Sequence, residues 1–139
     1  MKSGVMSSEY IFVYGSLRKG FSSPVRSVLD DHAEFIGEAI FQGKLYQIDW
    51  YPGVVSSGES NDIVYGEVYK IIEEKVVLST LDRYEGCTPL DPKPHAFVRK
   101  KMPIQLKKDG ERMAWIYLYN LPVDDKVYIP SGDYQQYKR

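Results

Sequence analysis

Alternating and short apolar runs dominate the chain, a pattern typical of β-strands rather than of long helices. The first run, 10–14, consists of β-forming residues and is apolar on both faces, as in a central strand. A partly alternating stretch begins at 33 and continues, after a bend or bulge at Gly43, to 48. Shorter runs predict further strands at 54–55, 64–71, 97–106 and 113–119, with a last extended piece within 127–134.

Turn residues separate these runs. Proline and glycine in Trp50-Tyr51-Pro52-Gly53 set the backbone angles of a turn, and Asp109-Gly110 carries a hairpin signal. Pro103 cannot donate a ladder hydrogen bond, so its strand is predicted to lie at an edge or to contain a bulge. The proline-rich stretch 88–95 is predicted to be irregular.

Two helices are predicted. The first begins with Ser23 as N-cap and Pro24 at the first helical position, and it ends near Asp31. The second covers 73–84, and Gly86 is the expected residue after its C-terminus. Their apolar faces are formed at helical spacing by Val25, Val28 and Leu29 in the first helix and by Val77, Leu78, Leu81 and Tyr84 in the second.

Strands outnumber helices, so the fold class is α+β. We expect a small mixed, mainly antiparallel β-barrel with about two short helices packed outside. A chain of 139 residues has the length of one domain. We expect a disordered lead-in at 1–8, a single domain at 9–135 and a tail at 136–139.

The net charge of −1 gives no electrostatic footprint for nucleic acid or for an anionic membrane. No apolar run approaches the roughly 18 residues that span a bilayer, and the polar N-terminus lacks the apolar core of a signal peptide. The single cysteine, Cys87, permits no intrachain disulfide, which fits a cytoplasmic location. His32, Cys87 and His95 do not form a metal-ligand pattern, so neither a metal nor a cofactor is expected. Oligomeric state is not predicted.

The loop after the first strand is the first candidate for chemistry. Gly15 allows the backbone to turn, Ser16 adds a hydroxyl, and Arg18 and Lys19 add positive charge. Such a loop can direct backbone N–H groups toward an anion. The alternative is an ordinary turn after a strand.

Glu85 is the informative carboxylate. It continues the stripe of Leu78 and Leu81 at positions i, i+3 and i+7, and it lies at the negative end of the helix dipole. Burial and the dipole both disfavour ionisation, so both are expected to raise its pKa toward that of a general base at neutral pH. The alternative is a frayed helix end with Glu85 in water. Asp82, off the stripe, is expected to be solvated, and Cys87 is expected to be a packing residue.

Two motifs in this order resemble the γ-glutamylcyclotransferase-like superfamily, which includes γ-glutamylamine cyclotransferases and AIG2-like proteins. They are Tyr14-Gly15-Ser16-Leu17-Arg18 after a strand and Leu81-Asp82-Arg83-Tyr84-Glu85-Gly86 at a helix end. The likeness extends over roughly 9–135. Phe97 and Tyr134 depart from the aromatic residues that many relatives have there, and Arg18-Lys19-Gly20 favours the γ-glutamylamine or AIG2-like branch.

The resemblance implies a site where the glycine loop meets the helix end. It implies that Glu85 is catalytic and that the substrate is a small γ-glutamyl amide or amine, which cyclises to 5-oxoproline and releases an amine. Candidate substrate-binding residues are Tyr14, Gly15, Ser16, Leu17, Arg18, Pro52, Gly53 and Tyr119. Arg99 is either a substrate contact or a structural ion-pair partner.

Two rival hypotheses remain at this point. One is a binding module that captures an amino acid or carboxylate in the same pocket without turnover. The other is a structural or interaction protein, which requires that Glu85 and Tyr14 be solvent-exposed and share no cavity.

Overall fold

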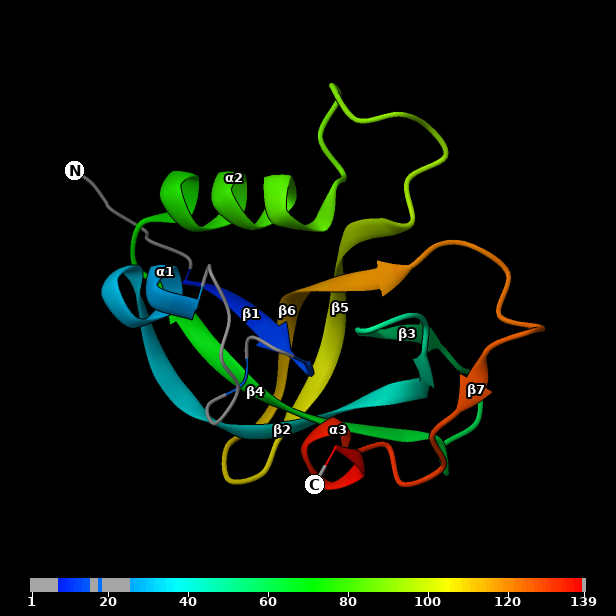
Figure 1. Ribbon diagram of the computed structural model, residues 1–139. Helices are drawn as coiled ribbons and strands as arrows, with labels where there is room; N and C mark the ends of the chain where they lie inside the picture. The colour runs from blue at the N-terminus through cyan, green and yellow to red at the C-terminus, as the bar shows by residue number, and fades with distance from the viewer. Residues whose placement is uncertain (1–7, 16–17, 19–25, 139) are drawn as a thin grey trace.

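The computed structural model describes residues 8–15, 18 and 26–138, and its centre is a closed barrel of five strands (Figure 1). The strands follow one another around the barrel in the order β2-β4-β1-β6-β5, and pairing of β2 with β5 closes it. Every pair is antiparallel except β1 with β6, which is parallel at Ile11 and Trp115. The strands are β1 (Glu9–Val13), β2 (Ala33–Gln47), β4 (Ile63–Ile71), β5 (Phe97–Leu106) and β6 (Gly110–Tyr119). The expected mixed, mainly antiparallel barrel is confirmed.

Strand β2 is continuous and changes its partner at Gly43. Residues 33–42 pair with β4, whereas 43–47 pair with β3 (Pro52–Ser56). A bend or bulge was expected at Gly43; the register shift lies between Phe35 and Gly37 instead, so the bulge at Gly43 is wrong. Gly43 is needed for close approach instead, because a Cβ there would lie 2.5 Å from the Val55 carbonyl oxygen. Strand β7 (Val127–Tyr128) adds to the same end of β2.

Within the described residues, three short helices accompany the barrel. Helices α1 (Arg26–His32) and α2 (Glu74–Glu85) lie side by side on its outside (Figure 1). Helix α2 ends as predicted, with Gly86 in the left-handed conformation at φ 71°. Helix α3 (Tyr134–Tyr137) was not predicted, although the Asp133 carboxylate caps it by accepting backbone N–H bonds. The expected start of α1, including Ser23 and Pro24, lies outside the described residues, and so do residues 1–7 of the expected lead-in at 1–8.

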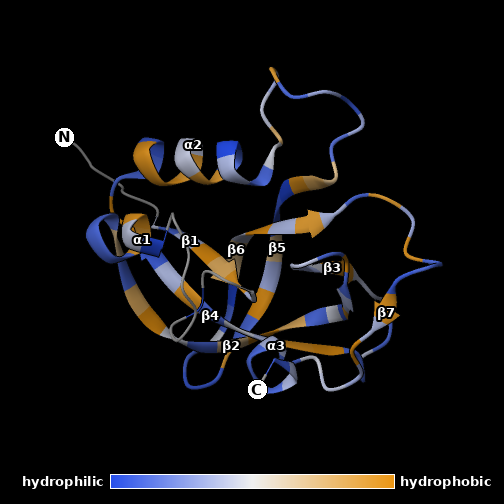
Figure 2. Ribbon diagram, viewed as in Figure 1, coloured by the Kyte–Doolittle hydropathy of each residue, from blue (hydrophilic) through white to orange (hydrophobic). Residues whose placement is uncertain are grey.

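The core has two parts, which β1 separates. Phe12 and Tyr14 point into the barrel, whereas Ile11 and Val13 pack with the apolar faces of α1 and α2. This explains why β1 is apolar on both faces, as its colouring in Figure 2 shows. Within the described ranges, no helix has the length and apolar character needed to cross a membrane.

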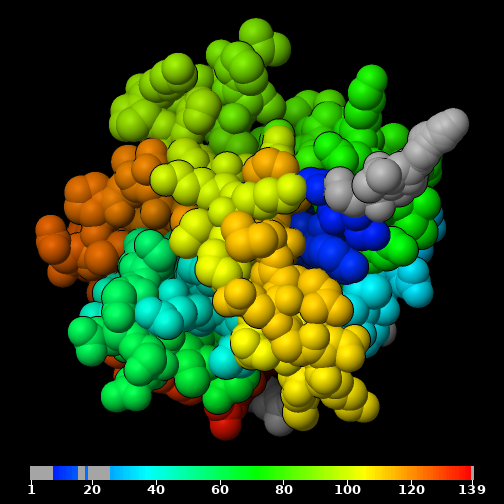
Figure 3. Space-filling view, turned by 180° about the vertical axis from the view of Figure 1, so that it is seen from behind, coloured from blue at the N-terminus to red at the C-terminus, as the bar shows by residue number. Residues whose placement is uncertain are grey.

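The remaining connections lie at the surface. The stretch 88–95 forms neither helix nor strand, as predicted. Seen from behind, it projects above the β5–β6 hairpin, which crosses this face of the molecule (Figure 3). Gly110, at φ 80°, forms the hairpin turn. Pro103 lies in a part of β5 that pairs only with β6, because β2 reaches only Gln105 and Leu106.

The contact between β4 and β1 predicts a steep cost for a side chain at Gly66. A Cβ there would lie 2.4 Å from the Val13 carbonyl oxygen and 2.5 Å from Cζ of Phe12. We expect Gly66→Ala to lower the free energy of unfolding by ~2 kcal/mol or more, because the barrel wall has to shift. Gly37→Ala is the matched control, since no heavy atom lies within 4 Å of a Cβ at this strand position. Equal losses for both variants in urea unfolding would contradict the packing.

Candidate active site

A cavity of about 290 Å³ opens where the end of β1, the turn between β2 and β3, the end of α2 and the β5–β6 pair meet. Its size suits an amino-acid-sized ligand. Aromatic side chains form most of its wall, and Glu85 is the only carboxylate among the described residues that line it. These residues are Phe12, Val13, Tyr14, Gly15, Trp50, Tyr51, Pro52, Tyr84, Glu85, Ala96, Phe97 and Tyr117.

Glu85 is the last residue of α2 and enters the cavity from the helix end. Leu78 and Leu81, which share its stripe, are buried against the barrel, so the face that carries Glu85 is fixed. Burial, followed by the nearby charge of Asp82, raises the pKa of Glu85 to about 7. Within the part of the chain that the structure describes, its carboxylate has no hydrogen-bond or ion-pair partner. This is a carboxyl group that can change protonation state near neutral pH.

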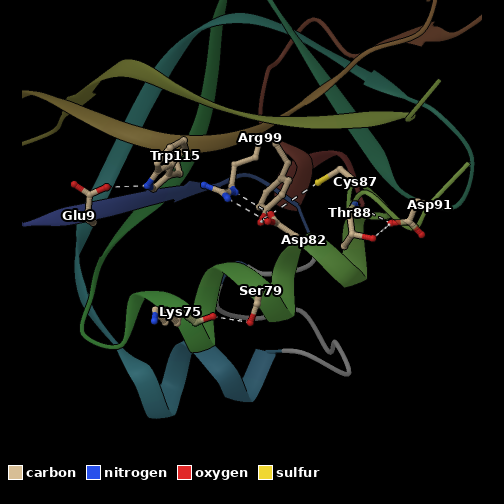
Figure 4. Close-up of polar contacts among 10 residues, drawn as sticks. Glu9, Lys75, Ser79, Asp82, Cys87, Thr88, Asp91, Arg99 and Trp115 are labelled. Atoms are coloured by element: carbon tan, nitrogen blue, oxygen red, sulfur yellow. Dashed lines mark hydrogen bonds and ion pairs between the residues drawn. The ribbon is translucent and has the colours of Figure 1, made fainter. Parts of the chain in front are cut away.

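Asp82 is not the solvated acid that the sequence suggested. Its carboxylate receives Nε and Nη2 of Arg99 at 2.8 and 3.1 Å and the hydroxyl of Tyr117 at 2.6 Å (Figure 4). Arg99 therefore serves as an ion-pair partner in this structure. The spacing of residues along the helix gave no hint of these contacts, because Arg99 and Tyr117 belong to β5 and β6, which follow the 88–95 stretch in the sequence.

Tyr14 and Gly15 bring the end of β1 to the same cavity. The Tyr14 hydroxyl is buried and donates to the Tyr117 carbonyl at 2.6 Å. Its pKa is raised well above the ordinary value by burial and by the charge of Glu85. A Cβ at Gly15 would lie 2.9 Å from Cγ of Pro52, so glycine allows the loop and the β3 start to pack closely. Ser16 and Leu17, predicted to continue this site, lie outside the described residues.

Arg18 is not among the described residues that line the cavity. Its guanidinium donates to Asp133 at 3.0 Å and lies 4.0 Å from the Glu67 carboxylate, and the residue is only 6% exposed. Its backbone N–H donates to the Gly15 carbonyl at 3.0 Å. Arg18 is thus held by contacts with Gly15, Asp133 and Glu67, and the direct substrate contact expected of it is not supported by this geometry.

Two further predicted residues support the wall from behind. Gly53 and Tyr119 are buried next to each other, since a Cβ at Gly53 would lie 3.0 Å from Cβ of Tyr119. The Tyr119 ring packs edge-to-face on Phe97 at 5.5 Å between centroids. Of the predicted residues, Tyr14, Gly15, Pro52 and Glu85 line the cavity.

Sequence reasoning missed most of the aromatic wall. Trp50 is 71% exposed and meets Tyr51 edge-to-face at 5.0 Å, and Tyr51 in turn packs on Phe97 at 5.8 Å. Tyr84 and Tyr117 complete the wall. The unusual number of tyrosines indicated a half-wet pocket in general, but alternation within a strand gives only the face of a residue and not the cavity behind it.

The geometry excludes one of the rival hypotheses and disfavours a thiol mechanism. Because Glu85 and Tyr14 share a cavity, the prediction made for a purely structural or interaction protein is wrong. Burial, followed by the charges of Asp82 and Glu85, raises the pKa of Cys87 to about 11. The thiol therefore stays protonated near neutral pH, which disfavours it as a nucleophile.

Comparison with known proteins identifies the family of this chain. The sequence profile described as "Gamma-glutamyl cyclotransferase, AIG2-like" matches residues 11–136. A provisionally named gamma-glutamylcyclotransferase of Methanocaldococcus jannaschii is 36% identical over 131 residues, covering 94% of this chain and 98% of that protein. The gamma-glutamylcyclotransferase family protein YtfP of Escherichia coli is 34% identical over 125 residues, covering 89% of this chain and 94% of that protein.

A solved structure shares the fold. The crystal structure of an AIG2-like protein from Mus musculus superposes with a TM-score of 0.71 at 22% identity, over 93% of this chain and 89% of that one. The sequence matches extend over nearly the whole barrel and include both motifs of the site. The chain belongs to the γ-glutamylcyclotransferase, AIG2-like family.

Proposed function

We propose that the protein cyclises a γ-glutamyl amide or amine to 5-oxoproline and releases the free amine. The observation that carries this proposal is Glu85, an unpartnered carboxyl group with a pKa of about 7 inside an amino-acid-sized cavity, among the residues that the structure describes. Family membership supports the same reaction type. The leaving amine is not specified by these observations.

The reaction needs no nucleophile from the protein. The substrate's own α-amine attacks its γ-carbonyl carbon, and the C–N bond to the leaving amine then breaks. Glu85 takes the proton that the attacking nitrogen loses and returns a proton to the leaving nitrogen, as base and then as acid. The cavity holds amine and carbonyl together, and this proximity is a large part of the rate enhancement expected for a cyclisation.

The other polar groups of the site suit binding better than proton transfer. Asp82 accepts hydrogen bonds from Arg99 and Tyr117, and the Tyr14 hydroxyl donates a hydrogen bond to a backbone carbonyl. The backbone N–H groups of the loop from Gly15, together with those of Ser16 and Leu17, are our candidates for holding the substrate carboxylate or the developing oxyanion. We further propose that the enzyme acts in the cytoplasm on a small-molecule substrate.

Glu85→Gln tests the proton-transfer role. Glutamine is nearly isosteric but cannot accept the proton, so we expect kcat for 5-oxoproline release to fall by roughly 10²-fold or more. Substrate affinity, measured by calorimetry, is expected to change little. Glu74→Gln, an exposed glutamate at the start of the same helix, is the control and is expected to keep full activity.

The same assay separates catalysis from capture. Affinity without 5-oxoproline release by the wild type, across a panel of γ-glutamyl amides and amines, would favour the binding module. Full 5-oxoproline release by Glu85→Gln would show that this carboxylate does not carry the protons.

The raised pKa of Glu85 also predicts how activity depends on pH. A base must be ionised to accept a proton, so kcat is expected to rise about tenfold per pH unit below 7 and to level off above about 7. A profile that stays flat from pH 5 to 8 would contradict this assignment.

Stability is expected to change in the opposite sense. The folded state raises the pKa of Glu85 from 4.5 to about 7, so this group's stabilising contribution is full below about 4.5 and is lost as pH rises through 7. The uncharged glutamine of the Glu85→Gln variant causes no such loss. We expect the free energy of unfolding of Glu85→Gln, relative to that of the wild type, to increase by about 3 kcal/mol between pH 4.5 and 8 in urea titrations.

A further inference from the structure

Asp82 is an acidic residue beside the cavity that the proposed chemistry does not use. It lies nearly one turn before Glu85 on α2, and donors from two strands converge on it. Arg99 of β5 approaches with two nitrogens at 2.8 and 3.1 Å, and the Tyr117 hydroxyl of β6 at 2.6 Å. Asp82 therefore ties the last turn of α2 to the barrel.

Arg99 is held from its other side as well. Its guanidinium carbon lies 4.3 Å from the centroid of the Trp115 ring, and Nε1 of Trp115 donates to Glu9 at 2.9 Å. Figure 4 shows Glu9, Trp115, Arg99 and Asp82 following one another from the start of β1 to the end of α2. The stacked ring and the two-pronged ion pair together hold the charge of Arg99 against Asp82.

We propose that Asp82 is a positioning residue for Glu85. By binding Arg99 and Tyr117, it fixes the end of α2 so that the Glu85 carboxylate faces the cavity. It also forms the ion pair with Arg99, so that Glu85 remains without an ion-pair partner among the described residues. This inference rests on the proposed function, since an unpaired carboxylate matters for a base and not for packing alone.

The other groups that face Glu85 are uncharged near neutral pH. They are Tyr14 after β1, Tyr51 in the turn between β2 and β3, Tyr117 in β6 and Cys87 two residues after α2. Burial is the main cause of a raised pKa in each of them. Asp82 adds to the effect of burial on the pKa of Glu85, and Arg99 is bound to Asp82.

Two neutralising variants test the proposal through the sign of their effects. Asp82→Asn removes the negative charge and releases Arg99, so the titration midpoint of Glu85 is expected to fall by roughly one pH unit. Arg99→Gln leaves the charge of Asp82 uncompensated, so the midpoint is expected to rise by about 0.5 unit or more. The double variant is expected to return toward the wild type. The probe is the side-chain carboxyl ¹³C resonance of Glu85, assigned by its loss in Glu85→Gln.

The controls separate charge from fold. Glu38→Gln breaks an ion pair of exposed side chains with Lys107 elsewhere on the barrel and is expected to leave the Glu85 titration unchanged. If a neutralising variant does not fold, Arg99→Lys keeps the charge but loses the two-pronged ion pair and the stacking on Trp115, so the midpoint is expected to rise by less than in Arg99→Gln. A midpoint that falls in Arg99→Lys would overturn the proposal.

The proposal would also be overturned if the titration midpoint of Glu85 moved in the same direction in Asp82→Asn and Arg99→Gln, or did not move in either variant. Because the NMR titration requires no turnover, this result is independent of whether any γ-glutamyl compound is cyclised. Failure of the proposed function would appear as absent 5-oxoproline in the wild type, with the opposite midpoint shifts still present. In an active enzyme, the acid limb of the kcat profile is expected to move with the NMR midpoint.

Discussion

The proposed chemistry depends on one constraint: a carboxylate has to be kept largely out of water without a cation beside it. Such a group is costly to ionise, and its pKa rises until it can exchange protons near neutral pH. Glu85 meets this condition because the apolar face of α2 carries it inward and Gly86 ends the helix directly after it. The nearby cation on β5, Arg99, is already bound to Asp82.

The barrel provides the rest by bringing distant segments to one end. Strand β1 has an inward face that fills the barrel and an outward face that packs on the helices, so its C-terminal end is fixed from both sides. The close contact between Gly15 and Pro52 joins that end to the β2–β3 hairpin. Buried Arg18 donates a hydrogen bond to Asp133 near the C-terminus. The cavity is thus formed by segments that are far apart in sequence but rigidly connected.

Local patterns predicted much of this arrangement and failed where long-range contacts decide. The spacing of Leu78, Leu81 and Glu85 indicated the buried face for the acid, because helical periodicity is a local property, but it left a frayed helix end as an alternative. Arg18 and Asp82 were misjudged for the opposite reason. Each is a charged residue whose partner lies on another element, and no spacing rule reveals that Asp133 or Arg99 will be adjacent in the folded barrel. The aromatic wall was missed because Trp50 and Tyr117 line one cavity only when β2, β3 and β6 are assembled.

Cyclisation and hydrolysis of a γ-glutamyl amide release the same amine, so the decisive distinction lies in the other product. Reaction in H₂¹⁸O, followed by mass spectrometry, tests the central claim most directly. Attack by the substrate's own amine predicts 5-oxoproline without ¹⁸O, formed in equal amount to the amine. Glutamate carrying ¹⁸O in its γ-carboxylate would show that water is the nucleophile and would contradict the mechanism.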